Sequence, residues 1–143
     1  MKKFHAILFL AFITIASCKS GTGGSDKIAE SVQATKTLTS IQWLDSSKQI
    51  GKITEGEKVE VVYRFVNTGN APLVIENVIP TCGCTVAEKP AEPIAPGKEG
   101  MIKAVFDSHG RVGSQHKSLT VSANTEAMSY PLTFDVEVLA SNK

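Results

Sequence analysis

The chain has 143 residues, of which 42% are hydrophobic and 20% are charged, and its formal net charge is +1. This balance is ordinary for a globular protein of one domain. It leaves neither a basic patch that would attract nucleic acid nor an acidic tail, so we expect no nucleic-acid partner.

The first 17 residues have the features of a lipoprotein signal peptide. Lys2 and Lys3 form a positive start, and residues 6–16 are apolar except for Thr14 but too short to span a bilayer as a stable helix. Small residues directly before Cys18 match the bacterial lipobox, which predicts cleavage before Cys18 and lipidation of its sulfur and new amino terminus. An ordinary secretory signal with an incidental cysteine, or an uncleaved anchor, is the alternative.

The residue after the cysteine, Lys19, is not the aspartate that retains some lipoproteins in the inner membrane. We therefore expect a protein of the cell envelope that is anchored to the membrane by a lipid on Cys18. The expected location is the outer membrane, on the side that faces the periplasm. Without the signal, 13 basic residues remain against 14 acidic ones. Residues 18–37 are rich in Gly, Ser and Thr and predict a flexible lipidated tether, and residues 38–143 form the folded domain.

From residue 38 the pattern changes to short apolar runs separated by turns. Strands are expected in the first half at 38–44, 50–53, 58–66 and 73–79. The segment 58–66 alternates with a period of two, which is typical of a half-buried strand, and its inner face holds Val59, Val61, Tyr63 and Phe65. By the same reasoning, one face of the strand 73–79 holds the side chains of Leu73, Ile75, Asn77 and Ile79. Pro80 cannot donate to a ladder and ends this strand.

The second half begins with a short edge strand at 85–87. Pro96 and Gly97 then fit the two central positions of a type II turn. Longer strands follow at 100–106, 117–123 and 128–139, with a loop at 107–115. Their inner faces hold Ile102, Ala104, Phe106, Leu119, Val121, Ala123, Leu132, Phe134, Val136 and Val138. Pro131 indicates that the last strand begins at an edge or a bulge.

About seven short strands with Gly and Pro turns, and no long helical pattern, predict an all-β protein, an immunoglobulin-like antiparallel β-sandwich. Trp43 precedes both cysteines of the domain, so the Cys…Trp…Cys pattern of antibody domains is missing. Three glycines fall at expected turns, where a backbone without a Cβ is favoured: Gly69, Gly83 and Gly97.

Several local motifs occur together in a familiar order: Phe65-Val66-Asn67-Thr68-Gly69, Pro72-Leu73-Val74-Ile75, Thr81-Cys82-Gly83-Cys84-Thr85, Pro93-Ile94-Ala95-Pro96-Gly97 and Lys117-Ser118-Leu119-Thr120-Val121 with Asn124. In this order and spacing, over residues 41–138, the chain resembles the bacterial family called domain of unknown function 1573. The resemblance implies an immunoglobulin-like domain similar to those of the ASPM, SPD-2 and Hydin group. It also implies a short exported lipoprotein, often from Bacteroidetes-type bacteria. It implies no established activity and supplies no catalytic residue.

The two cysteines of the domain, Cys82 and Cys84, lie on either side of Gly83. On an extended strand such cysteines would lie near the upper Cα separation for a disulfide, about 7 Å, and Gly83 lets the chain bend. Three roles stay open for the pair. It is a structural element or local cross-link, a strained and reachable bond for thiol–disulfide exchange, or a pair of soft thiolate ligands for Cu(I) or Zn(II).

Because the envelope is oxidising, we expect the pair to be oxidised in the exported protein. A tetrahedral zinc site needs two further ligands. The histidines that remain after signal removal, His109 and His116, lie near an expected loop without a matching spacing and are typical of solvated loop residues. We therefore expect no metal and no other cofactor.

The sequence has no nucleophile elbow, phosphate-binding glycine loop, HExxH or paired-carboxylate motif, so we expect no enzyme. Asp45, Asp107 and Asp135 fall at expected strand ends or turns, where local hydrogen bonding is their ordinary role. Ser114 and His116 are neighbours in sequence only, which carries no information on a triad. The expected function is a non-catalytic protein-interaction or structural module that meets an envelope protein or a glycan. The alternative is an envelope thiol-redox or metal-binding protein that uses Cys82 and Cys84.

Overall fold

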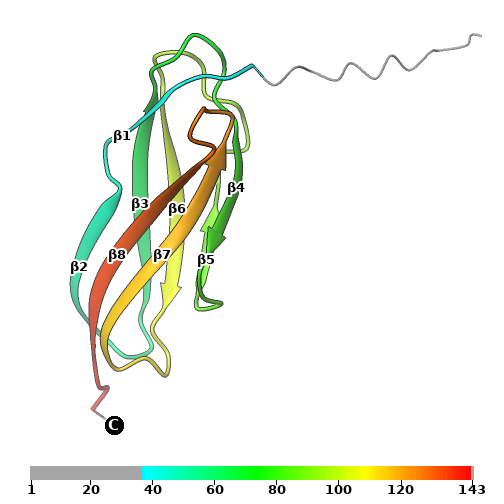
Figure 1. Ribbon diagram of the computed structural model, residues 1–143. Coiled ribbons are helices and arrows are strands. Elements are labelled where there is room, and N and C mark those ends of the chain that lie inside the picture. Colours follow the sequence, from blue (N-terminus) through cyan, green and yellow to red (C-terminus); the bar gives the residue numbers. More distant parts are fainter. Residues whose placement is uncertain (1–36, 143) are drawn as a thin grey trace, which may run out of the picture. The chain divides into compact units, whose positions relative to one another are not determined.

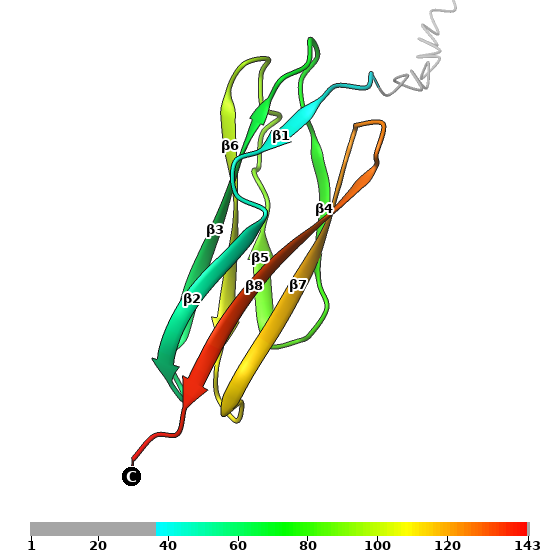
Figure 2. The same cartoon turned by 60° about the vertical axis from the view of Figure 1, so that its left-hand side comes forward.

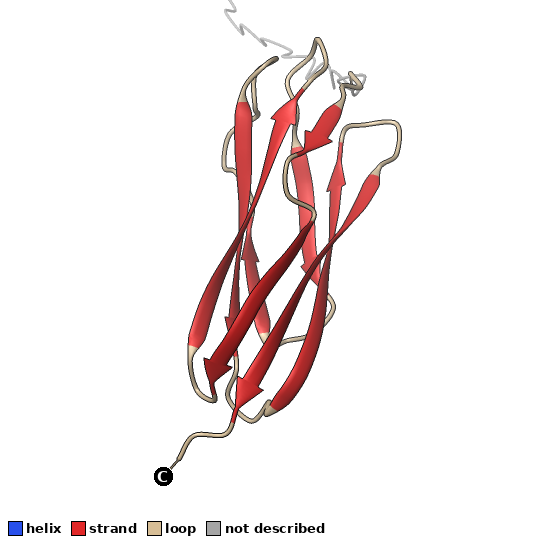
Figure 3. Cartoon of the chain, turned by 90° about the vertical axis from the view of Figure 1, so that its left-hand side faces the viewer, coloured by secondary structure: helices blue, strands red, loops and turns tan. Residues whose placement is uncertain are grey.

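The computed structural model describes residues 37–142, and all regular structure in that range is β (Figures 1 and 3). Its strands are, in chain order, β1 (Ile41–Trp43), β2 (Ser47–Thr54), β3 (Lys58–Asn67), β4 (Ile75–Pro80), β5 (Thr85–Glu88), β6 (Glu99–Asp107), β7 (Gly113–Ala123) and β8 (Ser129–Leu139). The expected signal peptide at 1–17 and nearly all of the expected tether at 18–37 lie outside the described residues.

The strands form two four-stranded sheets with the orders β1-β3-β6-β5 and β2-β8-β7-β4, packed face to face (Figure 2). The first sheet has the strand order A-B-E-D of immunoglobulin constant-type domains. The expected all-β, immunoglobulin-like sandwich is confirmed.

The expected segments at 38–44 and 50–53 correspond to β1 and β2, which lie in different sheets, so the described residues form eight strands rather than about seven. β1 pairs with β3 antiparallel, whereas β2 pairs with β8 in parallel, with Ser47 opposite Thr133. The expectation of a purely antiparallel sandwich is therefore wrong for this one pair. The reason is that the chain crosses between sheets after Trp43 and continues in the same direction beside the last strand.

The core lies between the sheets and consists of the alternating side chains that the sequence pattern predicts. Phe106 from the first sheet meets Phe134 from the second with ring centroids 5.6 Å apart, and Trp43 covers Phe65 at 5.3 Å. The largest fully buried side chains are Tyr63, Phe65, Phe106, Phe134, Leu73, Ile102, Leu119 and Leu132. Burial of these residues supplies the main driving force for folding.

The predicted face of 73–79 is wrong beyond Ile75. A register shift lies between Ile75 and Asn77 in the pairing of β4 with β7, which is a β-bulge. Because a bulge adds one residue, the alternation reverses behind it. Val78 then packs against the core, while Asn77 is exposed and Ile79 is 62% exposed.

The start of β7 differs from the expected boundary, and the pairing of β8 shows why Pro131 is tolerated near the start of that strand. β7 begins at Gly113, so the expected loop at 107–115 is shorter than predicted. Pro131 pairs with Thr120 on β7, but the pairing of β8 with β2 begins only at Thr133. The missing N–H of Pro131 thus falls where β8 has no second neighbour, as expected for an edge position.

Candidate functional site

The Cys82–Cys84 corner, residues 81–84, is the turn that carries the chain from β4 in the second sheet to β5 in the first (Figure 1). Thr81 holds one side of this turn, because both its amide and its hydroxyl donate to the carbonyl oxygen of Ser118 at 3.0 Å. On the other side, the amide of Asp107 donates to the carbonyl oxygen of Cys84 at 2.9 Å. The corner is thus tied to β7 and to the end of β6.

Cys82 and Cys84 are joined by a disulfide, and their Cα atoms lie 5.3 Å apart. The separation is shorter than on an extended strand because the amide of Thr85 donates to the carbonyl oxygen of Cys82 at 3.3 Å and closes a turn. Gly83 does not have positive φ, and a Cβ built on it would meet nothing within 4 Å. The bend therefore does not require the special backbone freedom of glycine at this position.

The two sulfurs have different surroundings. Cys84 is 8% exposed and belongs to the core, whereas Cys82 is partly buried and packs against the edge of that core. The amide of Cys84 lies 3.3 Å from Sγ of Cys82, to which it donates. The hydroxyl of Thr85 lies 3.8 Å from Sγ of Cys84. Cys82 is thus the more exposed of the two residues, and each sulfur has one hydrogen-bond donor beside it.

In the described residues, the hydrogen bonds of the two histidines go to aspartates and not to Cys82 or Cys84. His109 lies in the loop after β6, where its amide donates to the carboxylate of Asp107 at 3.0 Å, and this bond, followed by the contact with Lys58, lowers the pKa of Asp107. His116 lies within β7, which corrects its expected loop position. Among residues 37–142, no group of three or more His, Cys, Asp or Glu side chains is arranged to hold a metal ion.

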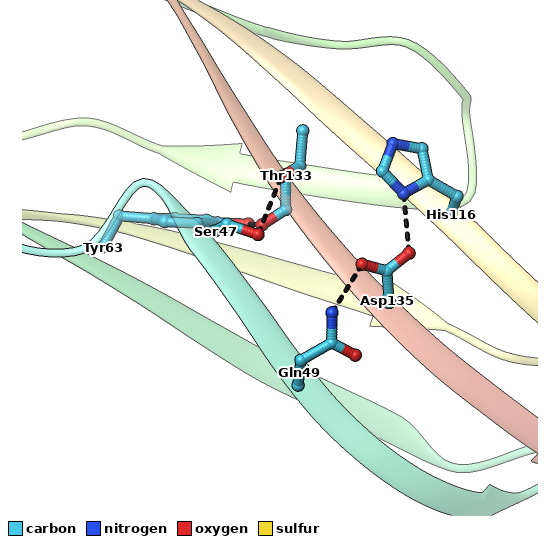
Figure 4. A network of polar contacts seen from close by, with 6 residues as sticks. All are labelled: Ser47, Gln49, Tyr63, His116, Thr133 and Asp135. Carbon is cyan, nitrogen blue, oxygen red and sulfur yellow. Dashed lines mark hydrogen bonds and ion pairs between the residues drawn. The ribbon is translucent and has the colours of Figure 1, made fainter.

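A second polar cluster lies on the outer face of the second sheet (Figure 4). Asp135 is in the middle of β8 rather than at a strand end, which corrects the expectation for that residue. Its carboxylate contacts Nδ1 of His116 at 2.6 Å and accepts from Nε2 of Gln49 at 2.8 Å. The contact with His116, followed by that with Gln49, lowers the pKa of Asp135.

This cluster lines an open hollow together with Lys52 and Ser114. His116 faces Asp135, but in the described part of the chain no hydrogen bond joins Ser114 to His116. A histidine–carboxylate pair without an adjacent nucleophile has the means to move a proton but not to form a covalent intermediate. The arrangement gives no positive evidence of catalysis.

Two of the three expected turn glycines have clear geometric roles. Gly97 has a φ of 73°, as the third position of a type II turn requires, and the amide of Lys98 closes that turn on the carbonyl oxygen of Ala95 at 3.1 Å. Gly69 does not have positive φ. A Cβ on Gly69 would instead lie 2.5 Å from the backbone nitrogen of Ser40, so close approach of two chain segments demands glycine there.

Two buried asparagines organise the loops at one end of the sandwich; both belong to the motifs of the family resemblance, but the sequence predicts no structural role for them. Asn67 donates to the carbonyl oxygens of Ala71 and Ile94 at 2.8 Å, and its own oxygen accepts from the hydroxyl of Thr39 at 2.9 Å. Asn124 accepts from the amide of Val74 at 2.8 Å. Buried amides with satisfied partners stabilise the loops that they join.

Cys18, the expected lipidation site, lies outside the described residues. Within the described range the structure has no helix of the length and apolar character that crossing a membrane requires.

Several solved structures share the fold. A protein of unknown function from Porphyromonas gingivalis W83 matches with a TM-score of 0.61 and 15% identity over 71% of this chain and 48% of that chain. The present chain thus spans about half the length of that protein. The ASH / PapD-like domain 7 of human CEP192 matches with a TM-score of 0.55 and 12% identity over 73% of this chain and 89% of the domain. At such identities the likeness shows the fold alone.

The secreted serine protease VesC from Vibrio cholerae also matches, with a TM-score of 0.55 and 11% identity over 73% of this chain but only 24% of that chain. A search of curated proteins found no match. The model of the family described as "Protein of unknown function (DUF1573)" matches residues 41–138. Since that match covers most of the chain and nearly all of the sandwich, this protein belongs to the DUF1573 family.

Proposed function

We propose that this chain is a lipid-anchored protein of the bacterial cell envelope whose sandwich is a non-catalytic module for binding another envelope protein. The observation that carries the binding role is a pair of exposed valines at the edge of the first sheet. Val86 on β5 is 67% exposed and lies opposite Val105 on β6, which is 37% exposed. On the same outward face of β6, Met101 is 50% exposed.

These residues form the β5–β6 surface, defined here as Val86, Met101 and Val105. β5 ends its sheet, so its outer edge lies outside the ladder. An edge strand with apolar side chains beside it is a template to which a partner adds a strand or an apolar surface. Lys103 and Glu88 lie opposite each other between the valine pair and Met101, so one pair of opposite charges crosses the surface and would need a polar partner in an interface.

The membrane anchor is supported by the sequence of residues 1–18, with its positive start, apolar run and cysteine. Attachment at the outer membrane, facing the periplasm, is supported by Lys19 after the cysteine. Several acyl chains on Cys18 would give stable anchoring, since each buried methylene contributes about 0.8 kcal/mol. The domain would then sit near the membrane surface on the tether formed by residues 18–37.

The anchor is tested by Cys18→Ser in cells that make the full chain. Incorporation of labelled palmitate and sedimentation with membranes should both be lost in this variant. Cys82→Ser serves as the control and should keep both. A Cys18→Ser protein that still carries palmitate and stays with the membrane overturns the anchor.

The binding role is tested by placing a photo-crosslinking amino acid at Val86 in intact cells. A single discrete crosslinked partner is expected there, and Val105→Asp should abolish the crosslink because it places a charge in the apolar contact. The same probe at Thr120, on the outer face of the other sheet, is the matched control. Equal crosslinking at both positions, or none at Val86, contradicts a partner at the β5–β6 surface.

A further inference from the structure

We propose that the Cys82–Cys84 disulfide is an exchange site for protein dithiols, with Cys82 as the sulfur that the partner attacks. Exchange at this disulfide does not depend on the binding role of the β5–β6 surface. The partner class is a protein that carries two neighbouring thiols, and the chain accepts two electrons from it.

The two cysteines differ in their exposure to solvent. Cys84 is 8% exposed and packed in the core, whereas Cys82 lies at the core's edge. Thiol–disulfide exchange requires the attacking thiolate to reach a sulfur directly, so the rate depends on which sulfur is accessible. An incoming thiolate therefore meets Cys82, and Cys84 is the sulfur displaced.

Each sulfur also has a hydrogen-bond donor beside it for the negative charge that develops during exchange. When the disulfide opens at Cys82, negative charge develops on Sγ of Cys84, which lies 3.8 Å from the hydroxyl of Thr85. When Cys82 later leaves the mixed disulfide, its sulfur lies next to the amide of Cys84, which donates at 3.3 Å. Hydrogen bonds to an ionised acceptor are stronger than bonds to a neutral one.

The fold does not depend on the disulfide for its stability. The disulfide encloses a single residue, Gly83, so it removes little entropy from the unfolded chain. Backbone bonds hold the corner independently, from Thr81 to Ser118 and from Asp107 to Cys84. The disulfide is thus able to open and close while the sandwich stays folded, which a reversible exchange site requires.

The exchange proceeds in two steps. A thiolate of the partner attacks Sγ of Cys82, a mixed disulfide forms, and the electron pair of the Cys82–Cys84 bond passes to Sγ of Cys84, which takes a proton. The partner's second thiolate then attacks the partner's first sulfur, which is bonded to Sγ of Cys82 in the mixed disulfide. The Cys82 thiolate leaves and takes a proton. The partner gains a disulfide, and the chain gains two electrons and two protons.

The first experiment treats the full chain, folded and without denaturant, with dithiothreitol as the dithiol. We expect two thiols to become available for alkylation, the β-sheet circular dichroism spectrum to persist, and oxidised glutathione to close the pair again. A melting temperature of the reduced form within roughly 5 °C of the oxidised form is expected. A pair that is reduced only after the protein is denatured overturns the proposal.

The second experiment separates the roles of the two cysteines with single variants and the disulfide 5,5′-dithiobis(2-nitrobenzoate) as probe. Cys84→Ser leaves Cys82 free, and Cys82→Ser leaves Cys84 free. Because Cys84 is packed in the core, we expect Cys82 to react at least about tenfold faster in the folded state. The double variant reports any reaction at Cys18 and is subtracted. Equal rates, or a faster Cys84, overturn the assignment of Cys82.

Discussion

The hydroxyl group of Tyr63 donates a hydrogen bond of 2.9 Å to the backbone carbonyl oxygen of Thr133 and so joins the two sheets across the core (Figure 4). Tyr63 is fully buried on β3, and Thr133 lies on β8. Burial raises the pKa of Tyr63 far above its ordinary value of 10.0. The phenol therefore stays neutral and keeps its role as donor at all ordinary pH values.

Replacement of this donor should weaken the contact between the sheets. We expect Tyr63→Phe to lower the free energy of unfolding at neutral pH by about 1–2 kcal/mol, because a partly buried carbonyl oxygen loses a donor. Urea unfolding followed by circular dichroism measures the change. Tyr130→Phe is the control for a tyrosine that bonds only to the hydroxyl of Thr125. A stability of Tyr63→Phe equal to that of the natural chain would contradict the bond's contribution.

Tyr63 should also make stability depend on alkaline pH. In the unfolded chain its phenol ionises near pH 10, whereas in the folded protein the raised pKa keeps it neutral. Its contribution is therefore fully present below about pH 10 and is lost as the pH rises above that value. Unfolding measured at pH 8 and at pH 11 should show a larger loss for the natural chain than for Tyr63→Phe. An identical loss in both would count against this assignment.

Asp45 should make stability depend on acid pH. It lies in the crossing between β1 and β2, where its carboxylate accepts from Nε of Arg64 at 2.8 Å and contacts Nζ of Lys48 at 2.8 Å. The bond with Arg64, followed by that with Lys48, lowers the pKa of Asp45 from 3.8 to about 2. A carboxyl group with a lowered folded-state pKa stabilises the fold above its unfolded value and loses that effect as the pH falls.

We therefore expect the contribution of Asp45 to be present above pH 3.8 and to disappear as the pH approaches about 2. Asp45→Asn should flatten the acid limb of the stability curve between these values. Acid titration followed by the fluorescence of Trp43 measures it. Asp107→Asn is the comparison, because the pKa of Asp107 is also lowered but by different partners. The effects of the two variants on the acid limb of the stability curve should therefore add.

Gly69 and Gly83 should respond differently to the same substitution. A Cβ at Gly69 would lie 2.5 Å from the backbone nitrogen of Ser40, while a Cβ at Gly83 would meet nothing within 4 Å. We expect Gly69→Ala to lower the free energy of unfolding by about 1–3 kcal/mol, since a backbone segment must shift. Gly83→Ala should stay within about 0.5 kcal/mol. Thermal unfolding compares the two, and equal effects would contradict this account of Gly69.

The bulge in β4 should reverse the cost of substitutions along that strand. Ile75 is 4% exposed and lies before the bulge, and Ile79 is 62% exposed and lies behind it. Ile75→Ala should cost about 2–5 kcal/mol of unfolding free energy through lost burial and a cavity. Ile79→Ala should change it by less than about 0.5 kcal/mol. Chemical denaturation of both variants decides, and a large cost at Ile79 would indicate a regular strand without the bulge.

The alternation of side chains predicts most of this fold, because every second residue of a strand points into the core between the two sheets. Tyr63 and Phe65 on β3, and Phe134 on β8, are buried where the pattern places them. The pattern fails at the β4 bulge, since one inserted residue reverses a face without any change in composition. It also does not show that β1 and β2 lie in different sheets, because pairing partners depend on residues far apart in the chain.

At the Cys82–Cys84 corner, the sequence identifies the residue types but not their order of exposure. Two cysteines two residues apart are equivalent in sequence, and only the packing of the β4–β5 turn makes Cys84 a core residue and leaves Cys82 at the edge. Likewise, Gly83 was expected to supply the bend, whereas the glycine that close packing demands is Gly69. Such roles depend on contacts between distant segments, which local patterns do not encode.

The parallel pairing of β2 with β8 has a consequence for how the chain is made. Ser47, the first residue of β2, is paired with Thr133, which the ribosome adds 86 positions later. Until β8 is synthesised, β2 has no partner strand and β7 lacks its neighbour on that side. High contact order of this kind slows folding. The second sheet therefore cannot be completed until the carboxyl-terminal strand has been synthesised, so its closure is expected to be a late step in folding.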